Sequence, residues 1–274
     1  MINCYSIDHI EDFDLKHIFD CGQCFRWTRE EDGSYTGIAM GKPVNMSFNQ
    51  GTLVIENCTE EEFNTVWKDY LDLDRDYGKI KRKLSRCDKD MRKAIKLGQG
   101  IRILRQDLWE IILSFIISQN NNIPRIKGCI ETLSELFGEC AGVYRGRTWH
   151  NLPTAEKLAS LTVEDLQPVK LGYRAKYLIG TAEAVCRKGL PRNEEELLAL
   201  PGIGPKVANC IELFAMGKMD SFPIDVWVQR VMHEVYGIDE KNKKEMQEYA
   251  VEHFGKLGGI AQQYLFYYIR EKDK

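Results

Sequence analysis

The pattern of hydrophobic positions changes along the chain at about residue 59. Before that point, short segments rich in strand-forming residues alternate with turns, which predicts an antiparallel meander. We expect its strands at residues 24–27, 35–39, 44–48 and 52–56. After that point apolar residues recur at helical spacing. The sequence therefore predicts an α+β protein, with an N-terminal β-rich domain at residues 1–98 and a larger all-helical domain at residues 99–274.

Capping residues indicate where the helices begin. Thr59–Glu62 forms a capping box, and Asp107 can cap a helix through the run Ile111–Ile117. That run is apolar nearly all round, so we expect this helix to be central. Thr162–Asp165 is expected to cap a further helix. Other helices are predicted at residues 173–188, 194–200, 245–254 and 259–270.

Composition narrows the class of protein. Of the 274 residues, 43% are hydrophobic and 29% are charged, which is typical of a soluble globular protein. The run Ile111–Ile117 is too short for a membrane span, and no secretory signal is visible, so we expect no membrane partner. The net charge of −3 is weak evidence against DNA binding, because backbone N–H groups at helix N-termini bind phosphate without formal charge.

Nine cysteines occur at irregular spacing, which fits reduced thiols in a cytoplasmic compartment. Cys21 and Cys24 form a CxxC pair without a second pair, and two ordinary thiols around a turn explain it best. The five histidines form no metal-like cluster. We therefore expect neither a metal nor an organic cofactor.

The stretch Leu200–Lys206, with the sequence LPGIGPK, lies between two predicted helices in a unit at about residues 194–216. Gly202 and Gly204 allow a tight hairpin, and Pro205 suits the first turn of the next helix. The N–H groups of such a hairpin can hold one DNA phosphate, and its carbonyls a monovalent cation. The two glycines alone would equally fit a plain helix–helix turn.

A second motif, residues 222–226, places Asp225 19 residues beyond Lys206. Asp225 begins a new helix there and is expected to be an N-cap, held ionised by backbone N–H groups beside a cationic transition state. Lys206 sits at a helix N-terminus, where the ammonium form is disfavoured. When a base is removed from DNA, its sugar becomes electrophilic, and a free amine can capture that sugar as an imine. The imine then leads to strand cleavage by β-elimination. On its own, Lys206 would as readily bind phosphate.

Together the two motifs resemble the endonuclease-III superfamily of base-excision enzymes with a helix-hairpin-helix element. The resemblance implies that Asp225 assists departure of the base and that Lys206 marks a bifunctional glycosylase/lyase. It also makes Cys210, four residues beyond Lys206 and on the same helix face, a wall of the base pocket.

Further stretches at residues 22–27, 118–125, 171–177 and 258–266 resemble the 8-oxoguanine DNA glycosylases. That resemblance implies a pocket for an extruded base, in which Gly22 accepts the N7 hydrogen, Gln262 reads the Watson–Crick edge, and Phe266 and Cys210 cover the two faces. It further implies that four residues fill the gap in the duplex and hold the orphaned cytosine. These are Asn120, Arg125, Tyr173 and Arg174.

The expected partner is double-stranded DNA with 8-oxoguanine opposite cytosine, bound by a monomer in the cytoplasm (nucleoid) of a prokaryote. Trp227 departs from the family pattern, because animal members have a histidine there. Relatives acting on thymine glycol or on adenine are disfavoured, since no cysteine follows Cys210 to build an iron–sulfur loop. A glycosylase for another damaged base and a non-catalytic helix-hairpin-helix DNA-binding module remain as alternatives.

Overall fold

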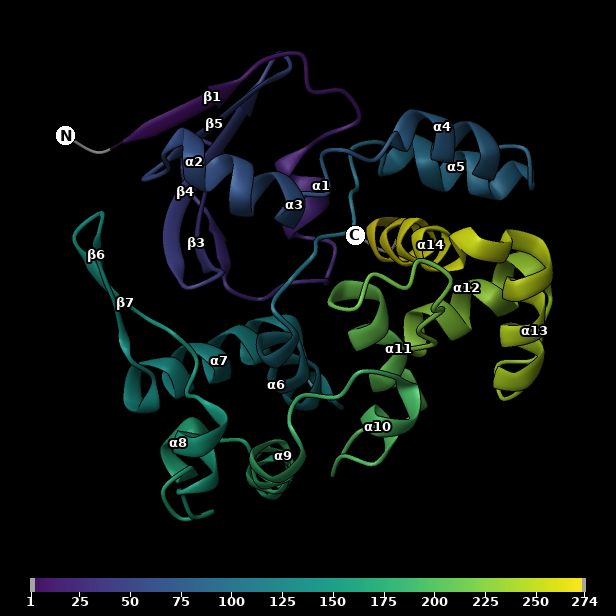
Figure 1. Cartoon of the computed structure of the whole chain (residues 1–274). Helices are drawn as coiled ribbons and strands as arrows, with labels where there is room; N and C mark the ends of the chain where they lie inside the picture. Colours follow the sequence, from purple (N-terminus) through teal and green to yellow (C-terminus); the bar gives the residue numbers. More distant parts are fainter. Residues whose placement is uncertain (1–2, 273–274) are drawn as a thin grey trace.

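A computed structural model describes residues 3–272 of the protein, so the outer limits of the two predicted domains lie outside the described residues. Its N-terminal part contains a five-stranded antiparallel sheet in the order β1-β5-β4-β3-β2 (Figure 1). Met46 on the central strand pairs with Tyr35 on one side and Ile55 on the other, and all three side chains are buried. The strands are β1 (Cys4–Ile7), β2 (Trp27–Arg29), β3 (Tyr35–Ala39), β4 (Lys42–Asn49) and β5 (Thr52–Glu56).

The predicted meander is confirmed for β3, β4 and β5, but the strand expected at residues 24–27 is wrong. Cys24, Phe25 and Arg26 are buried in an irregular segment, and β2 begins only at Trp27. The pairing of β2 with β3 extends only over Trp27–Arg29, so this segment lies outside the sheet. The edge strand β1 was not expected at all.

Short helices flank the sheet. Helix α1 (Leu15–Phe19) follows β1, and the predicted capping box at Thr59 is present at the start of α2 (Glu60–Glu62). A π-helical segment, Phe63–Trp67, links α2 to α3 (Lys68–Tyr70). Helices α4 (Tyr77–Leu84) and α5 (Lys89–Leu97) come next, and they join the core of the helical part rather than that of the sheet.

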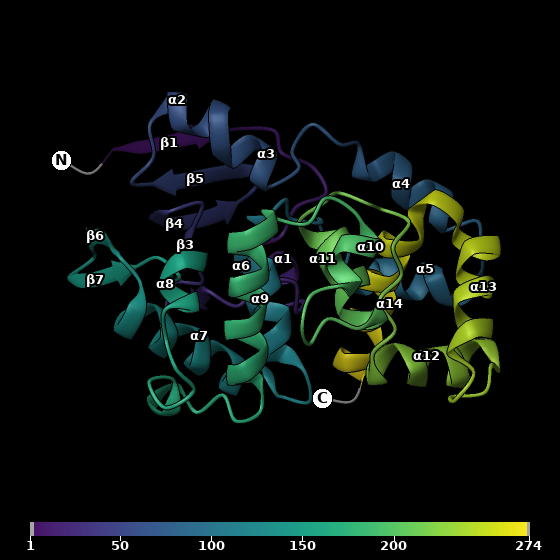
Figure 2. The ribbon, with the colours of Figure 1, turned by 60° about the horizontal axis from the view of Figure 1, so that its bottom comes forward.

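Helix α6 (Leu108–Ser118) lies at the centre of the helical part, as expected. Asp107 caps it through a 2.8 Å hydrogen bond from the Glu110 N–H, and residues 111–117 are all buried. It packs against α7, α9 and α11, and Figure 2 shows it behind α9. The other helices are α7 (Ile123–Phe137), α8 (Ala155–Ala159), α9 (Arg174–Lys188), α10 (Glu194–Leu198), α11 (Pro205–Phe214), α12 (Val226–Tyr236), α13 (Lys243–Phe254) and α14 (Gly258–Lys272).

Two local predictions were wrong in this part. Thr162 and Asp165 do exchange capping hydrogen bonds, but only a turn and a short 3-10 helix (Gln167–Val169) follow. Pro168 lacks the N–H that a continuing helix needs, and Lys170 adopts a left-handed backbone. A hairpin of β6 (Cys140–Tyr144) and β7 (Arg147–His150) was also missed.

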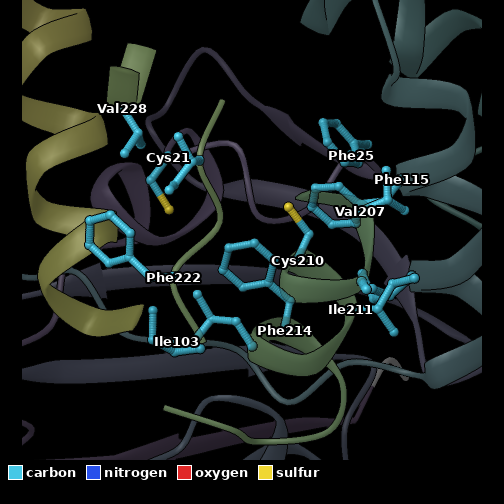
Figure 3. Close-up of a cluster of buried hydrophobic side chains, with 14 of the residues drawn as sticks. Cys21, Phe25, Ile103, Phe115, Val207, Cys210, Ile211, Phe214, Phe222 and Val228 are labelled. Atoms are coloured by element: carbon cyan, nitrogen blue, oxygen red, sulfur yellow. The ribbon is translucent and has the colours of Figure 1, made fainter. Parts of the chain in front are cut away.

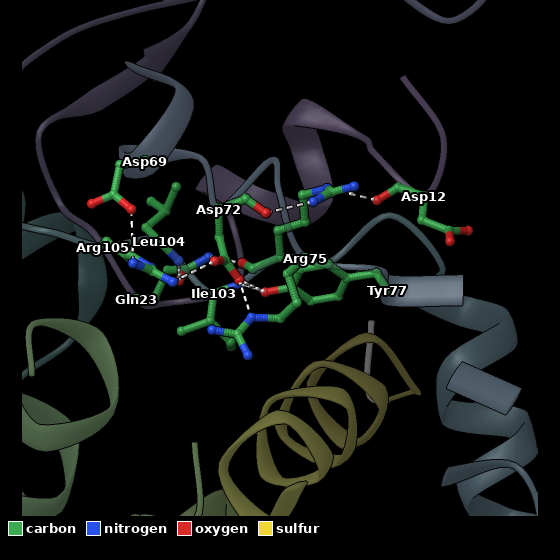
Figure 4. Close-up of polar contacts among 10 residues, drawn as sticks. Asp12, Gln23, Asp69, Asp72, Arg75, Tyr77, Ile103, Leu104 and Arg105 are labelled. Atoms are coloured by element: carbon green, nitrogen blue, oxygen red, sulfur yellow. Dashed lines mark hydrogen bonds and ion pairs between the residues drawn. The ribbon is translucent and has the colours of Figure 1, made fainter. Parts of the chain in front are cut away.

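A buried polar joint connects the sheet to the helical part. Asp72 accepts hydrogen bonds from Arg75 at 2.5 Å and from Tyr77 at 2.9 Å, and it pairs with Arg105 at 3.1 Å (Figure 4). Gln23 extends this joint by accepting from the Leu104 N–H at 2.9 Å. The joint therefore fixes the segment that carries Gly22 against residues 102–105. The predicted domain limit at residue 98 stays a prediction.

Among the residues that the structure describes, none of the helices combines the length and apolar content that a bilayer span requires.

Candidate active site

The predicted hairpin lies between α10 and α11. Gly202 has φ +78°, and a Cβ at this position would stand 2.5 Å from the Tyr177 ring, so both backbone and space require glycine. Gly204 is the N-cap of α11, and Pro205 occupies its first turn. These features place Lys206 in the first turn of α11.

Asp225 is the N-cap of α12, as expected, and its Oδ1 accepts a hydrogen bond from the Val228 N–H at 2.8 Å. Burial raises the pKa of the Asp225 carboxyl above its usual 3.8, while the Val228 N–H and the charge of Lys206 oppose this shift. Desolvation therefore outweighs the hydrogen bonds in its effect on this pKa, and the expected ionised state of Asp225 stays a prediction.

One pocket of about 390 Å³ brings together the two catalytic candidates and all four residues expected to contact the base. Lys206 and Cys210 come from α11, Asp225 from the start of α12, Gln262 and Phe266 from α14, and Gly22 from the loop after α1. These six residues span the chain from residue 22 to residue 266, so the fold alone creates their proximity.

The pocket wall is largely apolar, and Figure 3 draws Cys21, Cys210 and Phe115 among the buried side chains around it. The Lys206 Nζ lies 5.3 Å from the centre of the Phe115 ring. Burial raises the pKa of the Cys210 thiol to about 11, with the charge of Lys206 opposing that shift. Cys210 is therefore a neutral thiol at pH 7 and suits a wall rather than a nucleophile.

Gly22 lies opposite Phe266 with φ +82°, and a Cβ on Gly22 would stand 3.1 Å from the Phe266 ring. Its neighbours hold this loop tightly. Gln263 donates to the Cys21 carbonyl at 2.6 Å, and Gln23 donates to the carbonyls of Ile18 and Arg102 at 2.9 and 2.8 Å. The backbone of Gly22 is thus presented to the pocket in a fixed position.

A wider groove adjoins this pocket and shares Lys206, Asp225 and Trp227 with it. Asn120 and Gly204 line the groove, as do Lys218, Lys243 and Lys244. Glu194, Glu212 and Asp220 also line the groove, and Lys218 pairs with Glu212, so positive and negative charges are mixed along it. The N-terminus of α11 adds backbone N–H groups of the kind that bind phosphate. Trp227 stands where the groove and the pocket meet.

The remaining predicted residues lie around the loop at residues 119–122 and not in the pocket. Tyr173 is 46% exposed, and Arg125 is exposed at the start of α7, which Asn122 caps. Pro124 lies in the first turn of α7.

Arg174 is turned away from the surface. Its side chain is buried, and its guanidinium donates to the Gln119 carbonyl at 2.8 Å and to the Asn120 carbonyl at 2.8 Å. In this structure Arg174 braces the loop that carries Asn120, and its predicted contact with DNA stays a prediction.

Two residues at the site were not anticipated. Asn209 on α11 accepts a hydrogen bond from the Phe222 N–H at 3.1 Å and so fixes the segment that leads to Asp225. Arg270 lines the base pocket one helical turn beyond Phe266. Gln262, Phe266 and Arg270 are spaced by four residues, and this spacing in the sequence indicates that Arg270 shares their helix face.

No cluster of three or more histidine, cysteine or acidic side chains suited to a metal ion occurs within residues 3–272. All nine cysteines are free thiols.

Comparison with known proteins shows the superfamily and then the family to which the chain belongs. Residues 113–256, just over half of the chain, match the HhH-GPD superfamily of base excision DNA repair proteins, and the chain belongs to that superfamily. Residues 6–112 match the N-terminal domain of 8-oxoguanine DNA glycosylase. Within the superfamily, the chain therefore belongs to the 8-oxoguanine DNA glycosylase family.

Individual relatives support this family assignment. The Clostridium acetobutylicum 8-oxoguanine glycosylase/lyase, solved with double-stranded DNA containing cytosine opposite 8-oxoG, is 45% identical with a TM-score of 0.94, covering 100% of this chain and 99% of that one. The Arabidopsis thaliana N-glycosylase/DNA lyase OGG1 is 28% identical over 90% of this chain and 75% of its own length. A probable N-glycosylase/DNA lyase of Methanothermobacter thermautotrophicus is 27% identical over 95% of both chains.

Proposed function

We propose that this protein excises 8-oxoguanine paired with cytosine in duplex DNA and then cleaves the strand at the resulting abasic site. The observation that carries this proposal is the single pocket that unites Lys206 and Asp225 with Gly22, Cys210 and Gln262. A DNA-binding module would need the hairpin but would have no use for such a pocket beside it.

In this reaction the Lys206 amine attacks the sugar carbon C1′ while the bond to the base breaks, and the bonding electrons leave with the base. Asp225 faces the cationic sugar at that moment, and its carboxylate stabilises the positive charge. The amine adduct then opens to an imine. Loss of a C2′ proton expels the 3′ phosphate by β-elimination, and water finally releases Lys206.

Recognition of the base follows from the pocket walls. We assign the Gly22 carbonyl to the N7 hydrogen that guanine lacks, Gln262 to the Watson–Crick edge, and Phe266 and Cys210 to the two faces of the ring. Guanine would place its own N7 acceptor against the Gly22 carbonyl, which costs about 1–3 kcal/mol for an unsatisfied buried pair.

DNA contacts outside the pocket complete the proposal. Asn120, Arg125, Tyr173 and Arg174 fill the gap left by the base and hold the orphaned cytosine, and the N–H groups of the hairpin at Gly202 and Gly204 bind a phosphate. A monovalent cation at the hairpin carbonyls is part of the proposal. We further propose that the protein acts as a monomer beside the chromosome, in the cytoplasm of a prokaryotic cell, where free thiols such as those of its nine cysteines persist.

Borohydride trapping on duplexes with one 8-oxoguanine opposite each of the four bases tests the mechanism and the substrate together. We expect a covalent adduct with wild type, strongest opposite cytosine, and none with Lys206→Gln. Lys93→Gln is a matched control, because Lys93 is 58% exposed on α5, where it pairs with Asp90, and it does not line the base pocket. An adduct that forms only with another damaged base would overturn the substrate. No adduct with any lesion would leave a monofunctional glycosylase or a DNA-binding module.

A further inference from the structure

Three polar or aromatic side chains of α14 face the base pocket in a row. Gln262, Phe266 and Arg270 are spaced by four residues, so they lie on one face of the helix, and all three line the pocket. Arg270 has no role in the function proposed above.

Two contacts hold the Arg270 guanidinium in place. Its Nη2 donates to the Asp20 carbonyl at 2.6 Å, and its central carbon lies 5.4 Å from the centre of the Phe266 ring. The first contact ties Arg270 to the loop that carries Gly22, and the second is a cation–π interaction. A planar guanidinium fixed in this way presents its other N–H groups in a defined direction.

The Nη1 atom of Arg270 is buried and has no hydrogen-bond partner. It lies on the Gly22 side of the pocket, 3.6 Å from where a Cβ on Gly22 would stand. A buried donor without a partner, especially one on a charged group, is costly and needs a physical reason.

The same pocket contains a second orphaned atom of the opposite kind. The Gln262 Oε1 is also buried and unpartnered, so two residues that line the pocket carry one unpaired acceptor, on Gln262, and one unpaired donor, on Arg270. A ligand that pairs with both must itself carry a donor and an acceptor. An oxidised purine does, because it has N–H donors and carbonyl oxygens at C6 and C8 on either side of its N7 hydrogen.

We propose that Arg270 is a base-recognition residue, whose Nη1 donates a charge-assisted hydrogen bond to a carbonyl oxygen of the extruded oxidised purine. This proposal rests on the proposed function, since it assigns one more contact to the same base. The positive charge also stabilises the base as it departs, because the electrons of the breaking bond spread onto its carbonyl oxygens.

The test separates contact with the base from chemistry at the sugar. Arg270→Leu is compared with wild type in single-turnover release of 8-oxoguanine opposite cytosine and, separately, in strand cleavage at a preformed abasic site, which has no base. We expect base release to fall about tenfold to a hundredfold, the range for a lost hydrogen bond to a charged group, with cleavage at the abasic site within about twofold of wild type.

Two further variants sharpen the test. Arg270→Lys keeps the charge and should recover part of the base release. Arg82→Leu removes an arginine that is 69% exposed on α4 and outside the pocket, and it should behave like wild type in both assays. Thermal unfolding shows whether Arg270→Leu is folded, and if it is not, Arg270→Lys against wild type decides by the same comparison.

Equal losses on both substrates would overturn the proposal, because a residue that contacts only the base cannot slow cleavage at a site without one. No loss on either substrate would overturn it as well. Failure of the proposed function has a different signature. Wild type would then cleave abasic DNA but release no 8-oxoguanine, and the Arg270 assignment would fall with the substrate.

Discussion

Asn209 accepts a hydrogen bond from the backbone N–H of Phe222 at 3.1 Å and thereby links the helix that carries Lys206 to the segment that ends in Asp225. The same side chain donates to the Pro205 carbonyl at 2.8 Å, which fixes its orientation. Asn209 is thus a positioning residue for the two groups proposed to act on the sugar.

Replacing Asn209 by alanine should separate these two groups slightly without removing either. Misplacement of reacting groups by about 1 Å costs up to about a hundredfold in rate, so we expect both base release and borohydride trapping to fall between about tenfold and a hundredfold. Asn209→Asp retains the acceptor for the Phe222 N–H and should recover much of the rate. Equal rates for Asn209→Ala and wild type would show that the link is not needed.

Gly22→Ala should impair binding of the base, because Gly22 lies opposite Phe266 in the base pocket. A side chain at φ +82° costs about 1–2 kcal/mol, and the added Cβ would stand 3.1 Å from the Phe266 ring. We expect a loss of unfolding free energy of that size together with a marked loss of base release. Gly33→Ala is the matched control, since Gly33 has φ +85° and the nearest atom to its added Cβ, on the Arg29 side chain, is 3.9 Å away. It should lose similar stability and keep full activity; similar activity losses in both would contradict the pocket assignment.

The features that the sequence predicted well are local ones. The caps at Thr59, Asp107 and Asp225 depend on residues three positions away, and all three are present. Strand β1 was missed because its partner β5 lies some fifty residues further along the chain. The residues Cys4–Ile7 alone do not indicate that pairing. The direction in which Arg174 points, inward to the carbonyls of Gln119 and Asn120, likewise depends on a contact over more than fifty residues.

Arg174 should control the order of the loop at residues 119–122. A lysine cannot reproduce the forked contacts of the guanidinium with the Gln119 and Asn120 carbonyls. We therefore expect Arg174→Lys to raise amide hydrogen exchange in this loop and to weaken binding of lesion duplex by about tenfold. Arg187→Lys, at an arginine 66% exposed on α9, should change neither quantity. Unchanged exchange in Arg174→Lys would show that the loop is ordered without it.

Glu110 and Arg26 form a buried pair between α6 and the segment before β2, with 3.7 Å between the Glu110 Oε2 and the Arg26 Nη1. Burial raises the pKa of Glu110 to about 7, against the opposing charge of Arg26. Because the usual value is 4.5, the unfolded chain ionises at lower pH than the folded protein. The contribution of Glu110 to stability is therefore complete below about pH 4.5 and is lost as the pH rises to about 7.

Denaturant unfolding of wild type and Glu110→Gln at pH 5, 6, 7 and 8 measures this dependence. Between pH 5 and pH 7, wild type should lose unfolding free energy relative to the variant, by at most about 1.4 kcal/mol per pH unit, since only the wild type carries the titrating group. Above about pH 7 the difference between the two proteins should level off, because Glu110 is then ionised in both the folded and the unfolded state. A difference that stays constant across the range would mean that Arg26 holds Glu110 ionised in the folded protein. The ion pair, rather than desolvation, would then determine the pKa of Glu110.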